Sequence, residues 1–198
     1  QYMSSVFYFA ANLSNINALS EWNTGNVTDM SSMFGFTSLS DVDALRKWDV
    51  SKVKDMSYMF FSIDKLSNIN GLSEWKTGNA TSMRQMFSYS SISDVDALRK
   101  WDVSKVQNMQ NMFGDTKLTN LNGLSEWKTY NLSDMSFIFS SNNTLTDITG
   151  IQNWDVSNVT DMNYAFVWAK NVNNFNAIAD WKTPRLTTMD ETFSSLNI

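Results

Sequence analysis

The sequence predicts an α/β repeat solenoid that occupies residues 1–198 as a single domain of about seven coils. Three observations lead to this fold class. Tryptophan recurs at a nearly constant interval, a fixed set of apolar residues surrounds each copy, and the charges beside the tryptophans alternate in sign. A unit this short cannot bury its own apolar face, so neighbouring units must stack to form a continuous core.

The tryptophan interval defines the repeat. Consecutive copies are 26 or 27 residues apart, and Trp168 alone lies outside the series. The regular positions are Trp22, Trp48, Trp75, Trp101, Trp127, Trp154 and Trp181. The segment SDVDALRKWDVSKV occurs at 40–53 and again at 93–106, two units apart, so odd and even units form two alternating sub-types.

A short strand is expected around each tryptophan, because Trp48-x-Val50 alternates in the manner of a strand. The flanking residues before Trp include Glu21, Lys47, Glu74 and Lys100, so charges of opposite sign would stack in neighbouring coils. Parallel strands lie about 4.8 Å apart, and opposite charges at that distance attract. The charged columns would therefore face water, and the tryptophans between them would face the core.

A short helix is expected over 53–60, where apolar residues stand at positions i, i+3, i+6 and i+7. Ser51 and Thr77 precede such segments in the two sub-types, where they suit helix N-caps. Each unit of 26–27 residues thus reads as one short strand, one short helix and connecting turns.

The unit W-D-V-S-x-V-x-x-M-x-x-M-F, at 48–60 and 101–113, resembles the BspA-like leucine-rich-repeat surface proteins. It is most similar to their branch with Trp and Met-Phe in mycoplasmas and low-GC Gram-positive bacteria. The resemblance implies a leucine-rich-repeat-like right-handed coil on a secreted or wall-attached protein, often with an adhesive role. It brings no catalytic residues with it. The repeat departs from the pattern late in the chain, where Ile138 and Ala165 replace the first residue of Met-Phe.

Composition disfavours several classes of function. The net charge of −5 and the sequence pI of about 4.6 are unsuited to binding a phosphate backbone, so nucleic acid is not an expected partner. The chain lacks both histidine, the commonest general base, and cysteine. No apolar run is long enough to insert into a membrane. We therefore expect no enzyme activity, no catalytic or metal site and no cofactor.

Candidate ligand-binding residues come from two variable positions in the repeat. One lies two residues after the Met-Phe phenylalanine, and the other lies just before the Met-Phe pair. Aromatic residues alternate there with Ser, Asp and other polar residues, which indicates partly exposed side chains; Trp and Tyr are frequent anchors of binding surfaces. The alternative is ordinary packing against the next turn. The candidates are Phe9, Phe36, Tyr58, Tyr89, Phe137, Tyr164 and Trp168.

Asp41 with Asp43, and Asp94 with Asp96, offer carboxylate oxygens of the kind that bind calcium. The intervening coil has Asn68 and Asn70 in the same columns, and no glycine-rich calcium loop accompanies them. A ladder of solvated or turn-capping side chains is the favoured interpretation, and calcium binding is the alternative.

The expected function is a non-catalytic adhesion or ligand-binding module, outside the cell or on the bacterial cell surface. Its partner would be a host extracellular protein, mucin or glycan. The chain opens and closes within the pattern, so we expect it to be a fragment of a longer surface protein. The alternative function is a structural spacer, or stalk, that presents other domains, because near-identical units suffice for that task.

Overall fold

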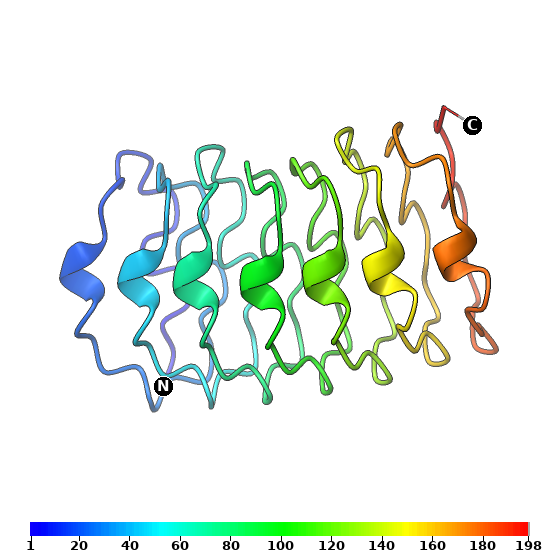
Figure 1. Ribbon diagram of the computed structural model, residues 1–198. Coiled ribbons are helices and arrows are strands. Elements are labelled where there is room, and N and C mark those ends of the chain that lie inside the picture. Colours follow the sequence, from blue (N-terminus) through cyan, green and yellow to red (C-terminus); the bar gives the residue numbers. More distant parts are fainter. Residues whose placement is uncertain (198) are drawn as a thin grey trace.

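The computed structural model describes residues 1–197 and shows a solenoid of stacked coils (Figure 1). One short 3-10 helix marks each of seven coils, and the seven form a row along one face of the solenoid. They are η1 (Asn17–Leu19), η2 (Asp43–Leu45), η3 (Asn70–Leu72), η4 (Asp96–Leu98), η5 (Asn122–Leu124), η6 (Thr149–Ile151) and η7 (Asn176–Ile178). The repeat solenoid predicted from the tryptophan interval is therefore the observed architecture.

The internal structure of each coil differs from the α/β prediction. The 3-10 helices are the only helices in the described part of the chain, and its strand pairing is limited to isolated parallel bridges. One series of bridges joins Asp29, Asp55, Ser82, Asn108, Asp134, Asp161 and Thr188 in successive coils. This series falls within the segments where helices were expected, since Asp55 lies inside 53–60.

The helix predicted over 53–60 is wrong because the backbone hydrogen bonds run between coils. The N–H groups of Met56, Tyr58 and Phe60 donate to carbonyls of the next coil at 2.8–3.0 Å. Within the coil the segment forms consecutive turns, in which Met59 N–H donates to the Met56 carbonyl. An apolar residue at every third position suits such turns as well as it suits a helix.

The strand predicted at Trp48-x-Val50 is also wrong, because side chains make the links between coils there. The Trp48 indole Nε1–H donates to the carbonyl of Leu19 in the preceding coil at 2.9 Å. The Thr77 hydroxyl, expected to cap a helix, is buried and donates to the Asp102 carbonyl of the following coil at 2.9 Å. Thr24 and Thr129 do the same, and Val50 and Val103 fill this column in the alternate coils.

The core runs the length of the solenoid. The inner tryptophans are buried as predicted, with 4% or less of the side chain exposed from Trp48 to Trp154, whereas Trp22 in the first coil is 39% exposed. The Met-Phe phenylalanines stack on one another, as Phe34 does on Phe60 with ring centroids 5.8 Å apart. Each coil completes the burial of its neighbour, so the terminal coils are the least buried.

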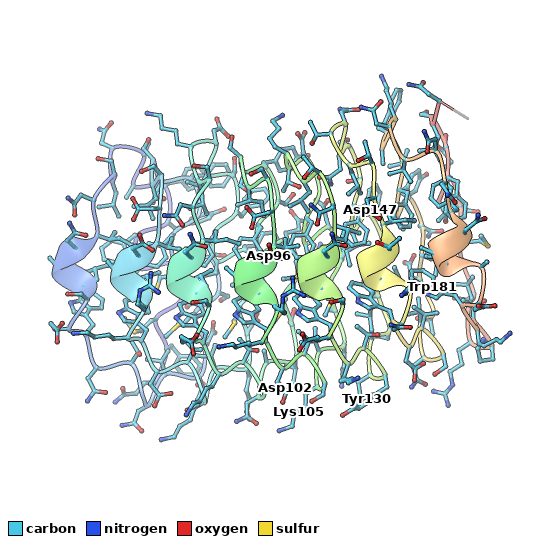
Figure 2. The ribbon with its side chains drawn as sticks, viewed as in Figure 1. Asp96, Asp102, Lys105, Tyr130, Asp147 and Trp181 are labelled. Carbon is cyan, nitrogen blue, oxygen red and sulfur yellow. The ribbon has the colours of Figure 1, made fainter. Side chains whose placement is uncertain are left out.

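The charged ladder is in the register that the sequence predicts. Lys47 Nζ lies 3.1 Å from Glu21 Oε1, and Lys100 Nζ lies 3.2 Å from Glu74 Oε1, each pair joining adjacent coils. Further polar side chains, among them Asp102 and Lys105, project from the lower edge of the solenoid (Figure 2). Lys105 donates to Asn79 Oδ1 of the preceding coil at 2.7 Å.

Candidate ligand-binding edge

One edge of the solenoid is built from residues in the left-handed backbone region. Sixteen non-glycine residues have positive φ angles of 50–63°, and they occupy two columns with one residue from each coil. The first column is Ser5, Ser32, Tyr58, Gln85, Asn111, Phe137, Tyr164 and Glu191, and the second is Phe9, Phe36, Ser62, Tyr89, Asp115, Ser141, Trp168 and Ser195. We call them the first and second left-handed columns. All seven predicted binding residues belong to them.

Hydrogen bonding between coils stabilises this unusual backbone. An L-residue in the left-handed region costs roughly 1–2 kcal/mol relative to the right-handed region. In every coil but the last, both left-handed residues donate their N–H to a carbonyl of the next coil; Tyr58 donates to Arg84 and Phe36 to Phe61, for example. None of the sixteen side chains is buried, although methionines beside them are. The two columns therefore fix the backbone and leave the side chains on the surface.

The first four coils carry one continuous group of aromatic side chains. Phe9 and Phe36 stack with ring centroids 4.3 Å apart and ring planes 6° from parallel. Phe61 contacts Phe36 at 5.2 Å and Tyr89 at 5.8 Å, in edge-to-face geometry. Tyr8 also packs against Phe9, at 4.6 Å. The group forms a contiguous aromatic surface on this half of the edge.

The sequence prediction missed Tyr8 and Phe61. Both occupy the position between the Met-Phe phenylalanine and the second column, where other coils have small residues such as Gly35 and Ser88. A Cβ atom on Gly35 would lie 2.8 Å from the Tyr8 ring, so glycine gives this ring the space it needs. The alternation of large and small residues at this position was the signal available in the sequence.

The later coils form an aromatic groove with a volume of about 510 Å³. It brings together Tyr89, Phe137, Tyr164 and Trp168, four of the seven predicted residues. Phe137 and Tyr164 stack with centroids 4.6 Å apart, and Tyr89 and Trp168 are about half exposed, at 47% and 50%. Phe9 and Phe36 line a separate hollow of about 300 Å³, which the large groove does not include.

A second hollow, of about 550 Å³, lies on the charged face beside Trp75. Its tryptophan is buried, and four of its polar side chains are paired with one another: Lys100 with Glu74, and Lys105 with Asn79. The aromatic groove is therefore the better candidate, because its hydrophobic side chains are accessible to a ligand.

The aspartates proposed as alternative calcium ligands bond to their own backbone. The Asp41 carboxylate accepts the Asp43 N–H at 3.3 Å, and the Asp94 carboxylate accepts the Asp96 N–H at 3.2 Å. Another such turn lowers the pKa of Asp102 below its ordinary value of 3.8, because Ser104 donates hydrogen bonds to the carboxylate. These contacts agree with the turn-capping interpretation of the ladder.

Within residues 1–197, no helix combines the length and the apolar character needed to cross a bilayer. The same residues contain no group of three or more acidic side chains arranged to hold a metal ion.

Comparison with known proteins places the repeat in a family. Residues 1–122 and residues 88–197 match the family described as Mycoplasma protein of unknown function, DUF285. The two matches overlap in the central coils, and together they extend over nearly the whole chain. No curated protein and no solved structure matches the sequence. The chain therefore belongs to the DUF285 family of repeat proteins.

Proposed function

We propose that this chain is a non-catalytic binding module of a bacterial surface protein, adhesive toward host extracellular proteins, mucins or glycans. Its left-handed columns would carry the recognition surface. We further propose that the repeat is a divergent relative of the BspA-like leucine-rich repeats, because it shares their Trp and Met-Phe unit while forming 3-10 turns and isolated bridges in each coil.

The observation that carries this proposal is the clustering of exposed aromatic side chains in the left-handed columns, although single aromatics such as Tyr130 are exposed elsewhere. Large aromatics are costly to expose, and contiguous exposed patches on soluble proteins often mark interaction sites. Phe9, Tyr89 and Trp168 are each about half or more exposed, in a column that also accepts Ser62 and Ser141. The fold therefore does not require aromatic residues at these positions, which favours a role in recognition.

A structural spacer is the second candidate, favoured by the near-identity of 40–53 and 93–106. Such a spacer would use the stack for its length alone. It offers no reason for the aromatic residues in the left-handed columns.

A binding screen distinguishes the two candidates. The chain and its triple variant Phe36→Ser, Tyr89→Ser, Trp168→Ser are tested against immobilised host glycans, mucins and extracellular-matrix proteins. Serine already occupies the second column at Ser62 and Ser141, so the variant should keep its circular dichroism spectrum and melting temperature. We expect at least one partner whose binding the variant loses. Absence of any partner for the folded chain would favour the spacer.

A further inference from the structure

We propose that the groove between Tyr89 and Trp168 binds a neutral oligosaccharide, laid along the solenoid axis. This inference rests on the proposed binding function and assigns it a chemical class of ligand and a place. The lining comes from five successive coils, from Arg84 to Glu191. At about 4.8 Å per coil the groove is about 19 Å long, which is room for several sugar units.

The aromatic side chains supply surfaces of the kind that pack against sugar rings. Pyranose rings present C–H groups on their faces, and the negative face of an aromatic ring attracts such weakly positive hydrogens. Tyr89 comes from the first of the five coils and Trp168 from the fourth, both in the second left-handed column. Short residues, Asp115 and Ser141, occupy the column between them, so the two rings are separated by open space rather than by another large side chain.

The polar lining suits hydroxyl groups, which both donate and accept hydrogen bonds. Arg84 offers guanidinium donors, Glu191 offers carboxylate acceptors, and the Gln110 amide offers both. Arg84 and Glu191 are the charged residues of this lining, and their charges cancel. Beside the lining, the charge of Asp115 in the second left-handed column is likewise matched by Lys170, whose Nζ lies 5.2 Å from the centre of the Trp168 ring. A groove without net charge favours a neutral sugar over a sialylated or sulfated one.

The floor of the groove is fixed before any ligand binds. The Asn111 amide donates to Ser88 Oγ at 3.0 Å, and its Oδ1 accepts a hydrogen bond from Ser140 Oγ at 3.2 Å, which joins three coils. The Gln110 Nε2 group donates to Ser136 Oγ at 3.1 Å, so that side chain is oriented as well. Side chains held in place lose little entropy on binding, which raises affinity for a ligand that fits.

The backbone and the aliphatic lining disfavour a peptide. The N–H groups of Phe137 and Trp168 already donate to Asn163 and Ser194, so they are not available to pair with an added strand. Val167 is the one aliphatic residue of the lining, and it is buried. An aliphatic anchor of a peptide would find little apolar surface here besides the aromatic rings.

The test uses the whole chain on an array of neutral, sialylated and sulfated oligosaccharides and of extracellular-matrix peptides. Bound neutral oligosaccharides are then titrated by calorimetry at about 0.1 M and 1 M salt. We expect binding that is insensitive to salt and an altered Trp168 fluorescence. The variants Trp168→Ser and Phe137→Ser should each weaken binding about tenfold or more. The matched control is Phe9→Ser, which removes an aromatic from the same column outside the groove and should bind normally.

Three results would overturn the inference. In the first, the chain binds sialylated or sulfated sugars alone. In the second, it binds neutral sugars, but Trp168→Ser and Phe137→Ser leave that binding intact. In the third, it binds peptides or proteins and no sugar. Each of these leaves the proposed binding function standing, because a ligand is still bound. Absence of binding to any sugar, peptide or host protein would overturn the inference and the proposed function together.

Discussion

At the scale of single residues, each internal tryptophan combines burial with one directed hydrogen bond. The Trp101 side chain is 3% exposed, and its Nε1–H donates to the Leu72 carbonyl of the preceding coil at 2.9 Å. Truncation would therefore leave a cavity and remove one of the two N–H donors of the Leu72 carbonyl, the other being the Trp75 N–H. The same residue type at Trp168 stands half exposed in a left-handed column. Trp101 thus contributes to the core, whereas Trp168 is placed on the surface that we propose for ligand binding.

We expect Trp101→Ala to lower the free energy of unfolding by about 3–5 kcal/mol, as for other buried aromatic residues. Chemical denaturation followed by circular dichroism gives this value. Trp168→Ala is the control and should change the free energy of unfolding by about 0.5 kcal/mol or less, as for an ordinary surface substitution. Equal effects of the two substitutions would contradict the division between core and surface tryptophans.

At the scale of one coil, the sequence predicted the contents of the core but not the path of the backbone. Spacing identified Met56, Met59 and Phe60 as one apolar face, and all three are buried. The same spacing could not distinguish a helix from consecutive turns, because the distinction depends on hydrogen bonds to a neighbouring coil. The residues of the left-handed columns, such as Tyr58 and Trp168, are not the glycines that usually signal this backbone region.

The candidate site was also only partly predictable, because the sequence shows which positions of the repeat vary but not which residues of different coils lie together. Variability at two positions of the repeat identified all seven exposed or half-exposed aromatics of the left-handed columns. The polar partners Arg84, Gln110 and Glu191 were not predicted, since only the stacking of five coils places them around one groove. A single unit of the repeat contains too little of the groove to show it.

The ladder of charges links one coil to the next. Lys100→Glu would place three acidic residues in a row with Glu74 and Glu126 and break the ion pair of Lys100 with Glu74. Both side chains of that pair are largely exposed, so we expect a loss of under about 1 kcal/mol in the free energy of unfolding at low salt. The loss should fade near 1 M salt, where charges are screened within about 3 Å.

Lys100→Gln separates the two causes of that loss, because it removes the attraction without adding a like charge. Thermal melts of both variants at low and high salt give the comparison, with the smaller shift expected for glutamine. A Lys100→Glu protein as stable as the parent at low salt would contradict a stabilising role for the charged ladder.

At the scale of the whole molecule, stability should rise from the ends of the solenoid toward its centre. Val6, Met189 and Phe193 are 37–49% exposed in the terminal coils, whereas Phe60, Phe87 and Phe113 are fully buried in the central ones. Stacked repeats gain their stability from contacts with neighbours on both sides. A terminal coil has only one such neighbour.

Hydrogen exchange of backbone amides measures this gradient. We expect the slowest exchange at Phe60, Phe87 and Phe113, whose N–H groups donate to the next coil, and faster exchange at Phe7, although its N–H makes the corresponding bond. Because these amides make equivalent hydrogen bonds, a difference in their exchange rates reports how often each coil opens locally. Uniform protection along the chain would mean that the coils unfold only as one unit.

In the left-handed columns, the backbone holds the coils together and the side chains form the outer surface, so the two functions fall on different atoms of the same residues. Their backbone N–H groups hold adjacent coils together whichever side chain is present, and the structure accepts Ser, Asp, Asn, Gln, Glu, Phe, Tyr and Trp at these sixteen positions. Point mutations there alter the outer surface without repacking the interior. Chains that share one scaffold can therefore diversify in what they display, much as the loops of an antibody diversify on a constant framework.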